Sequence, residues 1–166
     1  MAKILYLILF IVLVGKSGFA QIGLEANRSI RNKQRVNYIY NFTDYITWSS
    51  LSDNEMFKIG VFGNNENSLI TEFKEVATRK KIKNLTVEIV NITSIDQIKG
   101  IEILYIHEKS KLEIDAILPH LALSEILLVS ENYPFRQSMI NFMEFENEFH
   151  FDVNEAQIND AGLLVS

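Results

Sequence analysis

The sequence contains no cysteine, and this absence excludes several kinds of structure and chemistry. The chain has no disulfide framework, no thiolate nucleophile, and no cysteine-ligated zinc or iron–sulfur cluster. Proline and glycine are also scarce, with 2 and 7 residues, and no Ser- or Pro-rich linker interrupts the sequence. A chain of 166 residues with 48% hydrophobic residues is large enough to bury one core without covalent staples. These counts predict a single folded domain.

Positive charge is the scarcer sign, because 16 lysine and arginine residues stand against 21 aspartate and glutamate residues. The formal charge is −5, and a net anion is repelled by the phosphate backbone of a nucleic acid. We therefore expect no nucleic-acid partner.

Long apolar runs are confined to the N-terminus, where Ile4–Val14 form an uninterrupted stretch of 11 residues. Eleven helical residues span about 17 Å, whereas the hydrocarbon core of a membrane is about 30 Å thick. Lys3 precedes the run, and Gly18 and Ala20 are the small residues that a signal peptidase requires before its cleavage site. The pattern predicts export, with no stable membrane insertion after cleavage. The expected divisions are residues 1–20 for a cleaved signal peptide, 21–34 for a lead-in and 35–166 for the folded domain.

Hydrophobic periodicity predicts that helices and strands alternate along the folded domain. Helices are expected over residues 27–48, 68–79, 94–98, 112–121 and 156–164, and strands over residues 57–62, 85–90, 101–106 and 126–129. Residues 139–145 and 148–153 alternate apolar with polar, which is typical of an antiparallel hairpin with one solvated face. The pattern predicts a single-domain, three-layer α/β fold. Its mixed sheet has about five or six strands, with helices on both faces and the hairpin at the C-terminus.

The common catalytic signatures are missing as well. The sequence has no GxSxG, no SxxK, no P-loop and no HExxH. His107, His120 and His150 are widely separated, and each is expected at the surface or at the end of a strand. Gly60 and Gly63 do not form a dinucleotide-binding motif, and a tight exit from a strand is their expected role. We therefore expect a protein that is not an enzyme, with no catalytic residue, no cofactor and no metal.

Two clusters of side chains remain as candidates for a site. The carboxylates of Glu144, Glu146, Glu148 and Asp152 are expected on the solvated face of the hairpin, although a carboxylate pair can also serve acid–base chemistry. Aromatic residues precede Trp48 in the first helix and form either part of the core or a binding platform.

The order of the local motifs resembles that of the YfiR family, from about residue 35 to the end of the chain. The first helix and strand are similar to the "NF..Y..W…F.IGV.G" opening of that family, and a later segment is similar to its "LtVsd..gF" motif. The matching segments are Tyr38–Trp48, Phe57–Gly63, Ile101–Ile106, Leu127–Asn132 with Phe135, Met139–Phe142, Phe149–Asn154 and Ala161–Leu163.

The resemblance implies a non-enzymatic periplasmic regulator. Such a protein binds and restrains a membrane signalling partner, a diguanylate cyclase or a sensor kinase, through the partner's periplasmic domain. Its release raises cyclic-di-GMP and favours biofilm formation. The resemblance also implies a homodimer. Two departures from the family pattern are the missing cysteines, which put redox control in doubt, and a last helix that is shortened at Ser166.

Residues at the ends of elements are the candidates for contacting a partner or a ligand, because loops on a rigid scaffold usually carry recognition. They are Trp48, Glu131, Asn132 and Phe135. Two other classes of function stay open at this point. One is a periplasmic protein that binds a small ligand or a cell-wall fragment, and the other is a hydrolase with an unrecognised site.

Overall fold

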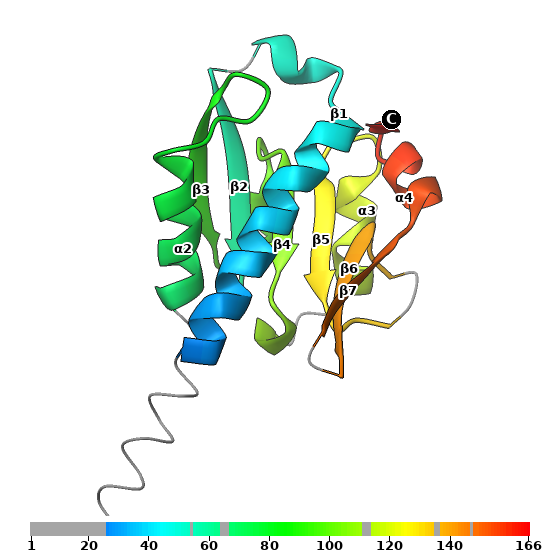
Figure 1. The fold of residues 1–166 in the computed structure, drawn as a ribbon. Helices are drawn as coiled ribbons and strands as arrows, with labels where there is room; N and C mark the ends of the chain where they lie inside the picture. Colours follow the sequence, from blue (N-terminus) through cyan, green and yellow to red (C-terminus); the bar gives the residue numbers. More distant parts are fainter. Residues whose placement is uncertain (1–25, 54, 64–66, 111–113, 135–136, 147) are drawn as a thin grey trace, which may run out of the picture.

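A six-stranded mixed sheet forms the centre of the computed structural model (Figure 1). The structure describes residues 26–53, 55–63, 67–110, 114–134, 137–146 and 148–166. The signal peptide expected over residues 1–20 and the candidate residue Phe135 therefore lie outside the described residues.

The elements alternate between helix and strand for most of the chain. The N-terminal helix covers residues 26–45. The strands are β1 (Ile46–Thr47), β2 (Met56–Phe62), β3 (Thr86–Ile92), β4 (Ile103–Ile106), β5 (Leu127–Glu131), β6 (Ile140–Phe145), β7 (Glu148–Val153) and β8 (Leu164–Val165). The further α-helices are α2 (Asn67–Ala77), α3 (Leu118–Leu121) and α4 (Glu155–Asp160). Short 3₁₀ turns are η1 (Ser50–Asp53), η2 (Ile95–Ile98), η3 (Glu108–Ser110) and η4 (Ile114–Ala116).

The strand order in the large sheet is β3-β2-β4-β5-β6-β7. Strands β2 to β6 are parallel, and β7 pairs antiparallel with β6. The chain first winds from β2 to β3, then crosses back to β4 and continues outward to β6. This is a doubly wound order, in which the winding direction changes between β2 and β4. The predicted α/β class, with a mixed sheet and a C-terminal hairpin, is confirmed.

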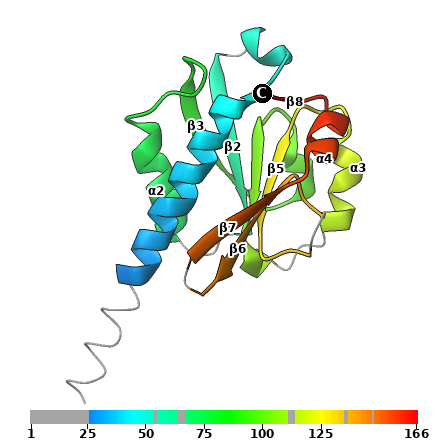
Figure 2. The ribbon, with the colours of Figure 1, turned by 45° about the vertical axis from the view of Figure 1, so that its right-hand side comes forward.

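Helices lie on both faces of this sheet (Figures 1 and 2). The N-terminal helix and α2 cover one face, and α3 lies against the other. Ring packing joins α2 to the sheet, because the Phe73 and Tyr105 centroids lie 5.8 Å apart. All four residues of β4 are buried, as expected for a central parallel strand covered on both faces.

The N-terminal helix buries the stripe that its sequence predicts. Val36, Ile39 and Phe42 recur at three-residue spacing and are buried against the sheet. The helix ends at Tyr45, and the prediction that it continues to Trp48 is wrong. Its end is set by a distant segment, because Ile46–Thr47 form β1 and pair antiparallel with β8.

The predicted terminal helix over residues 156–164 is wrong in its second half. Helix α4 spans Glu155–Asp160, and the side chain of Asn154 accepts a hydrogen bond at its N-terminus. Gly162 has a φ of +86°, a left-handed conformation that ends a helix readily and that glycine adopts without strain. The chain after Gly162 then forms β8 instead of a further helical turn.

The helix predicted over residues 112–121 is also shorter than expected. Its described part consists of the single 3₁₀ turn η4 and the four-residue helix α3. Pro119 lies in the first turn of α3. Proline is tolerated there because its missing N–H group would have no helical partner, whereas it interrupts a helix that begins further upstream.

One buried hydroxyl in the N-terminal helix predicts how stability depends on alkaline pH. Tyr40 is 5% exposed, and its hydroxyl has no hydrogen-bond partner among the described residues. Burial raises the pKa of Tyr40 from 10.0 to about 12. The unfolded chain therefore releases this proton at a lower pH than the folded chain, so the free energy of unfolding should fall as the pH rises from about 10 to about 12.

The variant Tyr40→Phe should lose this part of the pH dependence. Near pH 7 its free energy of unfolding should lie within about 1 kcal/mol of the parent, because the lost hydroxyl makes no hydrogen bond. Urea titrations at several alkaline pH values, followed by circular dichroism, measure the effect. The control is Tyr45→Phe, since Tyr45 is 60% exposed. Equal alkaline slopes in all three proteins would contradict the prediction.

Candidate binding surface

The carboxyl ends of β2 and β4 meet where the winding direction of the sheet changes. In doubly wound folds this position is the usual ligand crevice. Here the turn η3 packs onto it, and a Cβ atom added to Gly63 would lie only 2.6 Å from the Cα of Ser110. The hydroxyl of Ser110 lies 3.0 Å from that of Tyr133, which follows β5. Among the described residues, η3 and Tyr133 therefore cover this position, and an open hollow lies further along the sheet.

The close approach at Gly63 predicts a marked loss of stability for Gly63→Ala. The residue has a φ of +71°, and a methyl group would also strike the backbone of Ser110. Gly100 has a similar φ of +73° but nothing within 4 Å of an added Cβ. Gly63→Ala should cost about 2–3 kcal/mol, because strain and overlap add. Gly100→Ala should cost about 1 kcal/mol, from backbone strain alone. Urea denaturation measures both, and equal losses would show that the contact has no effect.

A buried cluster of polar side chains lies beside this position, at the carboxyl ends of β4 and β5. We call it the Arg35 cluster, and its members are Asn32, Arg35, Tyr105, His107 and Glu131. Arg35 projects from the N-terminal helix and donates from Nε to the carboxylate of Glu131. Its Nη1 donates to the side-chain oxygen of Asn32 at 3.0 Å. The Nε2 of His107 lies 3.6 Å from the other oxygen of Glu131.

The charged groups of the Arg35 cluster stabilise one another electrostatically. Burial is the largest single influence on Arg35 and lowers its pKa, but Glu131, Tyr105 and Glu108 together outweigh burial and raise the pKa of Arg35. Burial raises the pKa of the Tyr105 hydroxyl well above its ordinary value, and Glu131 raises it further. Arg35 therefore stays charged and Tyr105 stays neutral across the physiological pH range. Glu131 is 2% exposed, so solvent screens the pair weakly.

The Arg35 cluster connects four parts of the fold. Asn32 donates to Ser68 of α2 at 3.3 Å, and the guanidinium of Arg35 lies 5.2 Å from the ring centroid of Phe149 in β7. The ion pair joins the N-terminal helix to β5. Through the buried side chain of Arg35, the cluster links the hairpin to the N-terminal helix.

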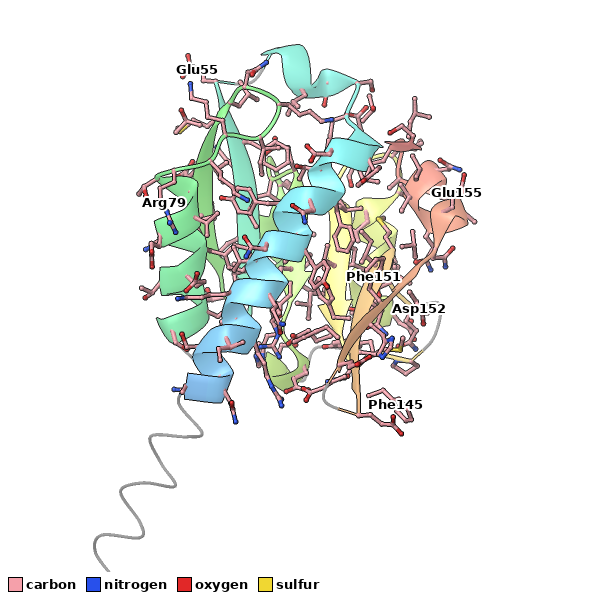
Figure 3. The ribbon with its side chains drawn as sticks, viewed as in Figure 1. Glu55, Arg79, Phe145, Phe151, Asp152 and Glu155 are labelled. Carbon is pink, nitrogen blue, oxygen red and sulfur yellow. The ribbon has the colours of Figure 1, made fainter. Side chains whose placement is uncertain are left out.

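An open hollow of about 850 Å³ lies between the residues after β5 and the β6–β7 hairpin. We call it the hairpin hollow, and it is lined by Asn132, Tyr133, Met143, Glu144, Phe145, Phe149, His150, Phe151 and Asp152. Phe145 is 65% exposed and Phe151 is 44% exposed. Figure 3 shows Phe145 projecting from the end of the hairpin, with Phe151 and Asp152 further along β7. Exposed aromatic rings beside carboxylates suit the recognition of a partner or a cationic group.

The acidic residues of the hairpin do not share one face, so that expectation is wrong. Glu144 pairs across the sheet with Phe149, on the side of the N-terminal helix, and it accepts from Arg31 at 2.5 Å. Glu148 and Asp152 alternate with Phe149 along β7 and point to the other side. The prediction is wrong because the turn between two strands sets their register, and the register decides which side chains share a face of the sheet. Composition does not show that register.

Trp48 lies at the opposite end of the sheet from the hairpin hollow. Its ring is 6% exposed, packs edge to face on Phe57 at 5.2 Å, and donates from Nε1 to the backbone oxygen of Glu102 at 3.3 Å. Trp48 also borders a smaller hollow of about 300 Å³ near the start of β2 and β4. The structure therefore does not bring Trp48 together with Glu131 and Asn132.

Two of the other predicted site residues, Asn132 and Glu131, lie close to the hairpin hollow. Asn132 is exposed, has a φ of +52°, and donates from its side chain to Glu108 at 2.5 Å. Asn132 lines the hollow, whereas the neighbouring Glu131 is buried in the Arg35 cluster beneath it. Phe135 lies outside the described residues.

The sequence patterns assign no role in a site to Arg35, Tyr105, His107 or the aromatic side chains of β7. A signal was available for the ion pair. Arg35 precedes Val36 on an otherwise apolar helical face, and Glu131 closes the apolar strand Leu127–Glu131. Two opposite charges at positions that should be buried indicate a pair, because neither is tolerated alone.

No group of three or more His, Asp or Glu side chains in the described part of the chain could hold a metal ion. Nor does any helix in that part have the length and apolar character needed to cross a membrane.

The fold and the hairpin hollow define a small α/β domain with a rigid surface suited to binding. A family model described as YfiR/HmsC-like matches residues 32–166, and the chain belongs to this family. The resemblance drawn from the sequence motifs is confirmed. Proteins of this family are periplasmic and regulatory rather than catalytic. No curated protein matches the sequence directly.

Proposed function

We propose that this protein is a non-enzymatic periplasmic regulator that binds and restrains an inner-membrane signalling protein. The partner is the periplasmic domain of a diguanylate cyclase or of a sensor kinase, so that binding lowers cyclic-di-GMP output and release favours biofilm formation. Family membership supports the regulatory class. The observation that carries the binding role is the exposed aromatic surface of the β6–β7 hairpin, held in place by the Arg35 cluster.

Recovery of a partner from membranes tests this proposal. The full chain, expressed in its own host with an affinity tag, is captured after mild cross-linking, and co-purified membrane proteins are identified by mass spectrometry. A cyclase or kinase should be recovered by the parent protein and lost with Phe145→Ser. Leu123→Ser is the matched control, since Leu123 is 83% exposed but lies between α3 and β5, outside the hairpin hollow. Recovery of no signalling protein by any form would count against the proposal.

Export through an N-terminal signal peptide forms part of the same proposal. Cleavage after Ala20 leaves residues 21–166, with a lead-in before the matched domain. The mass of the protein isolated from the periplasm should correspond to a chain that begins at Gln21. A full-length chain that stays in the cytoplasm would contradict this part.

A small-ligand binder is the second candidate function, and the hairpin hollow favours it. Its volume of about 850 Å³ lies in the range of ligand sites, and aromatic rings line it. The ligand in this case is a small molecule or a cell-wall fragment. Isothermal titration of cell-wall fragments and aromatic amines against the parent and Phe151→Ala separates this function from partner binding, because a ligand of the hollow requires no membrane protein.

A further inference from the structure

One edge of the large sheet is open beside the hairpin hollow. Strand β7 pairs with β6 on one side and has no strand on its other side among the described residues (Figure 2). Edge strands in proteins are commonly protected by lysine, by proline or by a covering segment, because their free backbone groups pair with other chains. β7 contains neither lysine nor proline. It also exposes Phe151 and Val153, at 44% and 49%.

The register of the hairpin defines which backbone groups face the open edge. The N–H of Asn154 donates to the backbone oxygen of Met139 at 2.7 Å. In an antiparallel pair, residues that exchange hydrogen bonds alternate with residues that do not. Asp152 and His150 therefore bond to β6, opposite Asn141 and Met143. The residues that alternate with them are Phe149, Phe151 and Val153, and the N–H and C=O groups of these three residues point away from β6.

The side chains of β7 also alternate in chemistry between the two faces of the sheet. On one face are the three apolar residues Phe149, Phe151 and Val153. Phe151 contacts the N-terminal helix, with its ring centroid 5.0 Å from that of Phe42. On the other face are Glu148, His150 and Asp152. A strand added at this edge would place its own alternate side chains beside these two rows.

The hairpin and the segment that follows it carry side-chain charge of one sign. From residue 137 to the end of the sequence there is no lysine or arginine, whereas the acidic residues are Glu144, Glu146, Glu148, Asp152, Glu155 and Asp160. Two of the three arginines of the N-terminal helix form ion pairs in this region, Arg31 with Glu144 and Arg35 with Glu131. An incoming chain with positive side chains would therefore meet carboxylates with no competing cation from the hairpin.

We propose that β7 is a docking edge for an extended, basic segment of the partner protein, which adds to the sheet as a seventh strand. The segment alternates apolar with Lys or Arg side chains, so that apolar groups pack beside Phe151 and Val153 while cations face Glu148 and Asp152. Backbone hydrogen bonds to the outward groups of β7 supply affinity, and the alternation supplies specificity. This inference rests on the proposed function and deepens it by naming the kind of segment that is bound.

A second copy of the chain fits this edge less well. Pairing of β7 with the β7 of another molecule would bring together two hairpins that carry the same carboxylates and no lysine or arginine. Like charges across an interface oppose association. The acidic edge therefore disfavours self-pairing and favours a basic strand.

A synthetic peptide tests the edge directly. The probe is an eight-residue peptide of alternating lysine and valine, and its matched control alternates glutamate and valine. The lysine peptide should bind at least about tenfold more tightly at low salt, and binding should weaken in about 0.5 M salt because surface charges are screened. Hydrogen exchange followed by NMR should slow at the amides of Phe149, Phe151 and Val153.

Two pairs of variants separate backbone pairing from charge. Val153→Pro removes an outward N–H while leaving the bonds to β6, and it should weaken binding about tenfold. Val153→Thr keeps that N–H and should stay within about twofold of the parent. Glu148→Lys should weaken binding severalfold, whereas Glu55→Lys should not, because Glu55 lies at the far end of the sheet (Figure 3). Thermal melts confirm that each variant is folded.

The outcomes separate this inference from the proposed function. Equal binding of the two peptides, no binding up to millimolar concentration, unchanged binding by Val153→Pro, or a dimer that occupies β7 would each overturn the docking edge. If Val153→Pro still recovers the membrane partner, the regulatory function stands and the docking edge fails. If the peptide binds at β7 but no signalling protein is recovered, the edge stands and the proposed function fails.

Discussion

Replacing Arg35 by alanine should destabilise the protein by about 3–5 kcal/mol. The substitution leaves the carboxylate of Glu131 buried and without its main partner, and Glu131 is 2% exposed. Removing one member of a buried ion pair is costly because the remaining charge has lost its hydration without compensation. Arg35→Ala also removes the contact of the guanidinium with Phe149. Urea denaturation at neutral pH, followed by circular dichroism, measures the change in the free energy of unfolding.

Two further variants identify the cause of that loss. Arg31 lies on the same helix as Arg35 and forms an exposed ion pair with Glu144 of β6. Arg31→Ala breaks this pair and should lower the free energy of unfolding by less than about 1 kcal/mol. The double variant Arg35→Met/Glu131→Leu replaces both charges with apolar side chains and should recover most of the loss. If the double variant is as unstable as Arg35→Ala, the loss of stability comes from packing. If Arg35→Ala is as stable as Arg31→Ala, the buried ion pair does not stabilise the fold.

Trp48→Ala should also destabilise the protein by about 3–5 kcal/mol, because a large buried ring is replaced by a cavity. The indole packs edge to face on Phe57 and donates a hydrogen bond to the backbone of Glu102. Trp48→Phe keeps a ring in this place and should lose less, with about 1 kcal/mol assigned to the missing hydrogen bond. Thermal and urea unfolding measure both variants by circular dichroism.

The control for Trp48 is Tyr45→Ala, three residues earlier. Tyr45 is 60% exposed, and its truncation should change stability by less than about 0.5 kcal/mol. Recovery of the membrane partner by the Trp48→Phe protein is a second measurement, which tests whether Trp48 contacts the partner. A folded Trp48→Ala protein of normal stability that no longer bound its partner would make Trp48 a contact residue instead of a core residue.

The alternation of helices and strands could be predicted because each element carries a local pattern. Val36, Ile39 and Phe42 define one face of a helix wherever the rest of the chain lies. The short sheet β1–β8 could not be predicted in the same way. Two-residue strands have no period, and their pairing depends on segments at opposite ends of the domain. The terminal helix was predicted too long for the same reason, since Leu164 and Val165 fit either pattern until β1 is placed.

The candidate site was predicted only in part. Asn132 follows a buried strand, and such positions are exposed at the carboxyl edge of a parallel sheet, where the structure places it. The Arg35 cluster brings together three segments that lie far apart in the sequence. Which charged residues meet there depends on the crossing of the helix over the sheet. Similarly, the opposite chemistry of the two faces of β7 follows from its register with β6.

The pairing of β1 with β8 makes the order of synthesis important for this chain. The N–H of Ser166 donates to the backbone oxygen of Tyr45, and these two residues are 121 positions apart. The end of the N-terminal helix therefore emerges from the ribosome long before the residues that hold it in place. Contacts between distant segments form slowly, because a long loop must close before any of them is gained. The β1–β8 pair thus forms only after β8 has been made, and the rings of Phe142 and Phe151 that pack on Phe42 of the helix are also made late.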